Sequence, residues 1–339
     1  MAVSLKKLSE LFGVSGHEDA VREYLSSLIS GKCDDMYTDA MGSLIAFRRG
    51  RSDKKRVLIG ANMDEPGLIV SGITDDGYLK FKEVGSPDPR TAVSKRVVTD
   101  KGVKGVIGMK AIHLQTKEER EAAVKTSSLY IDIGCKKRSA AEKRVELGDY
   151  IAFDTEFKEI GKRLRGKALG RFGTVCVLRA METEPAYDTY YVFSAQREIP
   201  CRVPGRGMAC AARAIQPDMA FIADIMSTSD IVGNNNGDAQ LGGGYVIEHM
   251  DRASIGSTAL IESVRAFLPG MIPERVCSLA STEAGAAAQA AEGCATLCIG
   301  IPCRYKNTPV SMMDKDDLHG AEELFAALAE ESDVITNGR

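Results

Sequence analysis

A pair of polar residues, Asn62 and Asp64, follows directly on an uninterrupted apolar run at 57–61. Such a run is typical of a strand that is buried on both faces of a parallel sheet. The two residues are two apart, so on an extended chain their side chains point the same way. Open α/β sheets bind ligands beyond the carboxyl ends of their strands. The pair is therefore a candidate for catalysis or binding, and the alternative is a strand end with solvated polar side chains.

The strands predicted at 189–194 and 219–223 also end in charged residues. Arg197 and Glu198 follow the first of these strands, and Asp224 follows the second. Polar residues that converge from several strand ends indicate a site, although any one of them alone would not. Two loops supply three further candidates, namely Gly170, Arg171 and Asn307.

Composition excludes several classes of function. The 339 residues carry a net charge of −3, which gives no electrostatic case for binding nucleic acid or an anionic membrane surface. No apolar stretch approaches the roughly 20 residues that a membrane span needs, and the first residues lack the apolar segment of a signal peptide. The nine cysteines are scattered and contain no Cys-x-x-Cys pair, which is typical of a reducing compartment. We therefore expect a cytoplasmic protein.

The order of predicted elements indicates two domains. Helices and strands first alternate, then short β runs with turn signals take over, including a hairpin turn at 75–77, and later the alternation returns. We predict an α/β fold with a mixed, largely parallel sheet flanked by helices, into which a small β-rich domain is inserted. The α/β domain would comprise 1–66 and 165–339, and the inserted domain 67–164.

Short motifs along nearly the whole chain resemble those of the tetrahedral metallo-aminopeptidases, a family that includes deblocking and glutamyl aminopeptidases. Each motif alone would be weak, but together they are specific. The matching segments are 13–18, 39–45, 61–67, 105–108 with His113, 131–134, 166–169, 196–198, 250–252, 282–285 and 304–309.

The resemblance implies an architecture and a reaction. It implies a zinc-aminopeptidase-like α/β domain and an inserted domain that pairs subunits and helps to assemble dimers into a dodecamer. It also implies hydrolysis of peptides from the N-terminus by two divalent metal ions that share a bridging carboxylate and a bridging water, with a glutamate as general base.

Three of the metal-ligand positions that the resemblance implies are replaced in this chain. Asn62 stands where the family has a metal-binding histidine, Gly170 where it has the bridging aspartate, and Asn307 where it has the final histidine. Only Glu198 and Asp224 keep a good ligand type. A zinc site needs about three or four nitrogen, sulfur or oxygen ligands with correct geometry, so we expect no cofactor to be required.

The general-base position of the family corresponds to Arg197 in this chain. A guanidinium cannot accept a proton near neutral pH, and at about 4 Å its charge repels a dication by several kcal/mol even at an effective dielectric constant of about 20. We infer that Arg197 or Arg171 takes over the electrostatic role of the metal by pairing with carboxylates such as Glu198, Asp224 or Asp64. Asp64 orients the first histidine in the family, and here no imidazole is present for it to orient.

The favoured hypothesis is a catalytically silent member of this family, with no catalytic residue assigned. It would bind a peptide or an amino acid, form a homo-oligomer from dimer to dodecamer, or assemble with an active relative. One alternative is an active aminopeptidase or hydrolase with a single weakly bound zinc, cobalt or manganese ion on Glu198 and Asp224, with Asp64 or Glu283 as a further ligand. A third hypothesis is a nonmetal amidase or a binding protein in which Arg197 binds a carboxylate ligand.

Overall fold

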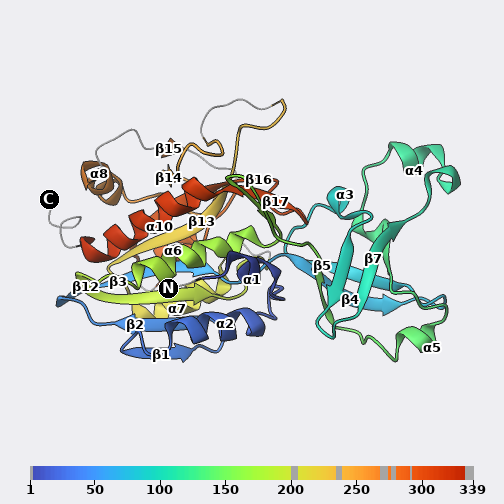
Figure 1. The fold of residues 1–339 in the computed structure, drawn as a ribbon, viewed down its shortest axis with the longest axis horizontal. Helices are drawn as coiled ribbons and strands as arrows, with labels where there is room; N and C mark the ends of the chain where they lie inside the picture. Colours follow the sequence, from blue (N-terminus) through green and yellow to red (C-terminus); the bar gives the residue numbers. More distant parts are fainter. Residues whose placement is uncertain are drawn as a thin grey trace.

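The computed structural model describes residues 3–199, 205–233, 239–267, 274–275, 280–290 and 292–332. In this part of the chain an 11-stranded sheet carries helices on both faces, and a separate closed barrel of six strands extends to one side (Figure 1). The predicted fold class, α/β with a small β-rich domain, is confirmed.

The large sheet is mixed, and its four central strands β12, β3, β13 and β16 run parallel. The flanking strands pair antiparallel, and the main path runs β1-β2-β12-β3-β13-β16-β17-β11-β10. The strands are β1 (Asp35–Thr38), β2 (Leu44–Arg48), β3 (Ser52–Asn62), β10 (Lys158–Ile160), β11 (Arg163–Gly166), β12 (Tyr187–Ser194), β13 (Met219–Ser227), β14 (Val246–Glu248), β15 (Glu274–Arg275), β16 (Ala295–Arg304) and β17 (Ser311–Asp314).

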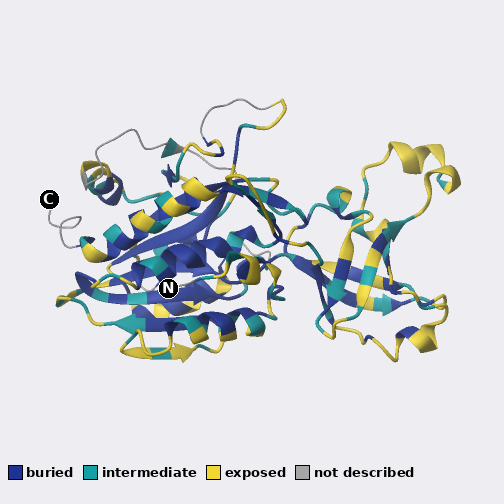
Figure 2. Ribbon diagram, viewed as in Figure 1, coloured by how far each residue is buried: buried dark blue, intermediate teal, exposed yellow. Residues whose placement is uncertain are grey.

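Alternate residues of the central strands lie in two different hydrophobic cores, because successive side chains of a strand point to opposite faces of the sheet. In β3, Val57 and Ile59 belong to the core on one face of the sheet, whereas Leu58 belongs to the core on the opposite face. Figure 2 shows the central strands as buried over most of their length. The first face carries α1 (Leu5–Glu10), α2 (Asp19–Ile29), α6 (Gly173–Ala180), α8 (Thr258–Phe267) and α10 (Lys315–Glu330), and the second carries α7 (Arg206–Ile215) and α9 (Ala284–Ala288).

The barrel has a hydrophobic core of its own, and its strands pair in the closed order β4-β5-β8-β7-β6-β9. These strands are β4 (Gly67–Ile73), β5 (Leu79–Val84), β6 (Arg96–Thr99), β7 (Lys104–Met109), β8 (Leu129–Asp132) and β9 (Tyr150–Phe153). The short helical turns around them are α3 (Pro89–Ala92), η1 (Ile112–Leu114), α4 (Lys117–Glu121), η2 (Thr126–Ser128) and α5 (Arg138–Ala141).

Strand pairing divides the chain slightly differently from the predicted boundaries. The barrel begins at Gly67, where the insert was expected to begin, and its last strand ends at Phe153. Beyond that strand, β10 pairs with β11, which pairs with β17 of the large sheet. Residues 158–164 therefore pair with the large sheet, and the independence of the two domains stays a prediction. Among the described residues, no helix combines the length and hydropathy that crossing a bilayer needs.

Candidate functional site

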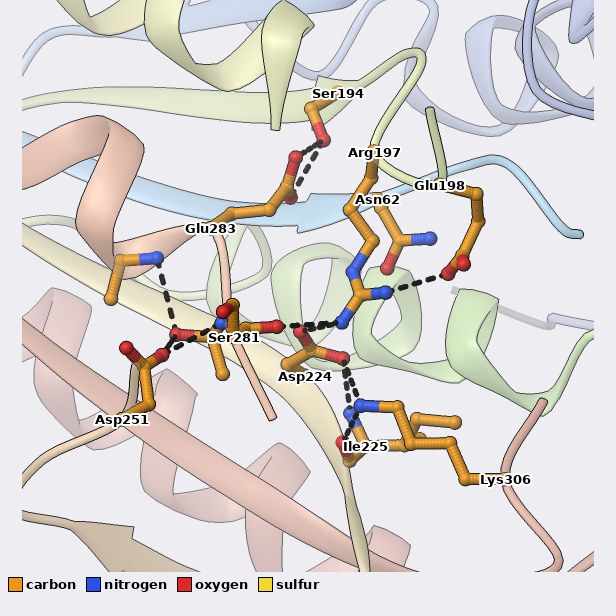
Figure 3. A network of polar contacts seen from close by, with 12 residues as sticks. Asn62, Ser194, Arg197, Glu198, Asp224, Ile225, Asp251, Ser281, Glu283 and Lys306 are labelled. Atoms are coloured by element: carbon orange, nitrogen blue, oxygen red, sulfur yellow. Dashed lines mark hydrogen bonds and ion pairs between the residues drawn. The ribbon is translucent and has the colours of Figure 1, made fainter. Parts of the chain in front are cut away.

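The carboxyl ends of the central strands bring the predicted residues together. Ser194 at the end of β12 pairs in register with Asn62 at the end of β3. Asp224 lies on β13, the other parallel neighbour of β3. It lies within this strand and not after its end as predicted, because β13 continues to Ser227. Arg197 and Glu198 lie on the segment that leaves β12 (Figure 3). Parallel strands that end at one edge of a sheet thus place these polar side chains in one cluster.

Arg197 lies between two carboxylates. Its Nη1 donates to Oε1 of Glu198 at 2.6 Å, and its Nη2 donates to Oδ2 of Asp224 at 2.7 Å (Figure 3). The same Nη2 donates to the carbonyl of Ser281 at 3.3 Å. The Arg197 side chain is only 7% exposed, and its Nε has no hydrogen-bond partner among the described residues. The guanidinium is therefore held chiefly by two buried ion pairs.

Asp224 contacts a second cation, Lys306, which follows β16. Its Nζ lies 3.7 Å from Oδ1 of Asp224 and donates to the carbonyl of Ile225 at 2.7 Å. Burial raises the pKa of Asp224, but the charges of Arg197 and Lys306 and the hydrogen bonds from Arg197 and Ile225 together hold that pKa below its ordinary value. Asp224 is therefore ionised at neutral pH and carries a salt bridge on each of its two oxygens.

Asn62 and Asp64 form a second part of the cluster. The Asn62 amide donates to Oδ1 of Asp64 at 3.0 Å, and the backbone N–H of Glu198 donates to Oδ2 of Asp64 at 2.8 Å. Burial raises the pKa of Asp64, and the nearby charge of Glu18 raises it further. Burial also raises the pKa of Glu198, against the opposing effect of Arg197. The two side chains that the spacing of Asn62 and Asp64 predicted to share a direction are thus in contact.

Glu283 joins the cluster from the N-terminal end of α9. Both of its carboxyl oxygens lie 2.7 Å from the hydroxyl of Ser194, and the side chain is buried. Burial raises the pKa of Glu283 to about 8, so this carboxyl is mostly protonated at neutral pH. Asp251 fixes the preceding turn, because its Oδ2 accepts from both the backbone N–H and the hydroxyl of Thr282.

Gly170 and Arg171 are adjacent in sequence but lie in different surroundings. A Cβ added to Gly170 would lie 3.9 Å from the Asn62 amide nitrogen and 3.8 Å from Cδ1 of Ile225, so a side chain here would face the cluster. Arg171 instead points toward the N-terminal segment, where its Nη2 bonds Oε1 of Glu65 at 2.8 Å. Arg171 therefore pairs with Glu65, not with the carboxylates that were expected from the sequence.

The loop after β16 supplies one residue that the sequence reasoning included and one that it missed. Asn307 adopts a left-handed backbone conformation with φ of +62°, and its carbonyl accepts from the backbone N–H of Asp88 in the barrel domain at 3.4 Å. Lys306, which reaches Asp224, was not among the predicted residues. Its only signal was a basic side chain inside a matched motif. Ser194 was missed as well, although it ends a predicted strand.

The side chains of the cluster are poor ligands for a pair of metal ions. Among the described residues, no three His, Cys, Asp or Glu side chains are placed where they could hold a metal ion together, whereas a zinc site needs about three or four such ligands. Glu198 and Asp224 have suitable oxygens, but each of them accepts a hydrogen bond from Arg197. The side chains in this arrangement do not fit two adjacent dications.

Comparison with protein families gives a match over most of the chain. Residues 42–324 match the family described as M42 glutamyl aminopeptidase. A protein from Acetivibrio thermocellus, named a putative aminopeptidase, is 31% identical over 329 residues, which cover 95% of this chain and 96% of that protein.

Solved structures show the same architecture. A TET aminopeptidase from a marine sediment Thaumarchaeota archaeon superposes with a TM-score of 0.90 and 28% identity, over 98% of this chain and 96% of that one. The TET1 peptidase of Pyrococcus horikoshii, which can assemble into a tetrahedron or a large octahedral shell, gives a TM-score of 0.84 and 31% identity over 96% of this chain and 98% of that one.

Proposed function

The chain belongs to the M42 glutamyl aminopeptidase family, and from this premise we propose that it keeps the family fold without the hydrolytic reaction. Its role would be to bind a peptide or an amino acid, or to take part in an assembly. The observation that carries this proposal is the Arg197 guanidinium, which bonds both carboxylates that retain metal-ligand chemistry, Glu198 and Asp224.

Two physical arguments support the proposal. Arg197 stands at the general-base position that the resemblance implies, and a guanidinium cannot take a proton from water near neutral pH. Its fixed charge also lies where it opposes any cation bound by Glu198 or Asp224. Glu283 is a poor substitute for the base at neutral pH, because burial raises its pKa to about 8 and keeps it protonated.

The test compares the natural chain with a variant that restores the implied site. The full variant carries Asn62→His, Gly170→Asp, Arg197→Glu and Asn307→His, and the matched control carries the same changes but keeps Arg197. Hydrolysis of aminoacyl arylamides and short peptides is measured with zinc, cobalt or manganese, with and without a chelator. We expect no chelator-sensitive turnover from the natural chain or the control, and bound metal in the full variant. Turnover by the natural chain that a chelator abolishes would overturn the proposal.

A second candidate is an active hydrolase with a single metal ion, and one observation favours it. Four carboxyl groups lie in the same region, because burial and also the charges of Asp64 and Asp224 raise the pKa of both Glu198 and Glu283. This candidate predicts one zinc, cobalt or manganese ion per chain, with turnover that Asp224→Asn abolishes. Metal analysis of the natural chain after saturation and desalting separates it from the first candidate.

We also propose that the chain assembles with itself, from dimer to dodecamer, or with an active relative. The TET1 peptidase to which it is similar forms large shells. The η1 turn of the barrel domain exposes two large apolar side chains, Ile112 at 70% and Leu114 at 62%, which is the type of surface that association buries.

We propose the reducing cytoplasm as the location of this protein, because its cysteines are scattered along the sequence.

A further inference from the structure

Two side-chain cations neutralise one pair of carboxylates in this cluster. Arg197 bonds Oδ2 of Asp224 and Oε1 of Glu198, while Lys306 approaches the other oxygen of Asp224 (Figure 3). The cations come from different segments, one after β12 and the other after β16. The carboxylates therefore receive positive charge from two directions, as they would from two separate ions.

Burial makes this compensation necessary. The four side chains are each between 3% and 10% exposed, and a buried carboxylate without a counter-ion is strongly unfavourable. The Arg197 Nε is buried and has no acceptor in the described part of the chain. The described residues around the guanidinium thus match its charge without accepting from all of its hydrogen-bond donors. A site shaped only to hold an arginine would satisfy those donors.

We infer that Glu198 and Asp224 form a cation site whose occupants, Arg197 and Lys306, are built into the chain, and that removal of the Arg197 side chain converts it into a site for an external cation. This inference rests on the proposed function, since a natural chain that held two metals would leave no room for the internal cations. Beyond the proposed function, we infer that the site requires a positive charge and does not require a particular side chain.

The surrounding atoms indicate which external cations would enter. Besides the two carboxylates, the carbonyls of Ser281 and Ile225 face the cations, and Asn62 lies beside them in the cluster. Oxygen ligands of this kind suit manganese and calcium better than zinc. Guanidinium would replace the missing side-chain group directly. A Cβ at Gly170 would make ordinary van der Waals contact with Ile225 and Asn62, so no side chain at this position competes with an entering cation.

The experiment follows thermal unfolding of the full chain as a function of added cation. The natural chain, Arg197→Ala and a matched control, Arg304→Ala, are compared in low millimolar guanidinium chloride, manganese chloride or calcium chloride, against sodium chloride of equal ionic strength. Arg304 forms a less buried ion pair with Asp230, outside the cluster. We expect the midpoint of Arg197→Ala to rise by about 2 °C or more with guanidinium and with manganese, and those of the other two proteins to stay unchanged.

Removal of both internal cations sharpens the same test. Arg197→Ala combined with Lys306→Met should bind manganese more tightly than Arg197→Ala alone, because the remaining fixed charge is gone. If Arg197→Ala does not fold without additives, Arg197→Gln replaces it, and folding that depends on guanidinium or manganese supports the inference as well. A folded Arg197→Ala that responds no more than Arg304→Ala refutes it. Chelator-sensitive hydrolysis by the natural chain would refute the proposed function instead, so the two failures are distinguishable.

Discussion

Two buried arginines of this protein differ in the groups that hold their guanidinium. Arg171 is completely buried and donates to four backbone carbonyls, those of Leu8, Leu11, Gly13 and Met63, as well as to the carboxylate of Glu65. Arg197 is slightly exposed, bonds two carboxylates and one carbonyl, and leaves its Nε without a partner in the described chain.

This difference indicates that Arg171 has a structural role, whereas Arg197 occupies a cation site. Arg171 fastens the N-terminal segment to the end of β3, and Lys167 shares Glu65 with it at 2.9 Å. Each donor of its guanidinium meets an acceptor, so a free cation could not replace it without losing the tether. Arg197 is surrounded by acids that need a positive charge and little else, which is the condition under which another cation could take its place.

The largest effect is expected from Arg171→Ala. It removes five hydrogen bonds and leaves buried carbonyls without donors, so we expect a loss of about 5 kcal/mol in the free energy of unfolding or failure to fold. Urea unfolding measures this loss. The control Arg179→Ala breaks a surface pair with Glu323 and should cost less than about 1 kcal/mol. Equal losses in the two variants would contradict the structural role of Arg171.

Arg197→Ala should cost less, about 3 kcal/mol without added cations, because it removes three hydrogen bonds where Arg171→Ala removes five. Guanidinium should recover part of this loss in Arg197→Ala and none of it in Arg171→Ala, which was never a site for a free ion. Urea unfolding in matched guanidinium and sodium concentrations makes the comparison. Recovery in both variants, or in neither, would remove the distinction between the two arginines.

Glu283 gives the cluster a pH dependence of its own. Its folded pKa of about 8 lies above the ordinary value of 4.5, so the folded chain holds a proton that the unfolded chain releases. The resulting stability is complete below pH 4.5 and is lost as pH rises toward 8, by roughly 4 kcal/mol. Glu283→Gln should remove this slope in urea unfolding measured from pH 5 to 8. Parallel curves for the two proteins would show that Glu283 is ionised throughout.

The smallest effect on folding is expected at the exposed η1 turn of the barrel domain, where no buried charge is involved. Ile112→Asp with Leu114→Asp should change the free energy of unfolding by less than about 0.5 kcal/mol, yet reduce the mass of the assembly. Sedimentation measures that mass. Leu147→Asp, at a residue exposed to a similar degree at 69%, is the control. An unchanged mass would show that this turn lies outside the contacts between subunits.

The convergence of the strand ends could be predicted from the sequence, whereas the direction of single side chains in loops could not. Asn62 and Asp224 follow apolar runs that form neighbouring parallel strands, and such strands run to a common edge. Asn62 ends β3, whereas Asp224 lies within β13, just beyond the residues that pair with β3. Gly170 and Arg171 lie in the 3₁₀ turn η3 (Leu169–Phe172), where consecutive side chains point about 120° apart. The prediction that Arg171 pairs with the carboxylates of the cluster was wrong for this reason, because its neighbour Gly170 faces the cluster and Arg171 does not.

Lys306 was missed for a related reason. Its neighbours Tyr305 and Asn307 both have positive φ, at +60° and +62°, so the chain turns sharply twice around it. No helical or strand period applies to such a loop, and the reach of its ammonium group to Asp224 follows only from the folded backbone. The residue types at the metal-ligand positions that the resemblance implies, in contrast, can be read directly from the sequence.

Anomalous diffraction at the zinc edge, from crystals of the natural chain grown with excess zinc, shows directly whether Glu198 and Asp224 hold a metal ion. We expect no anomalous peak between these two residues, with the Arg197 guanidinium bonded to both. Two peaks about 3.5–4 Å apart at that position, the spacing of two-metal enzymes, with Arg197 displaced, would contradict this expectation.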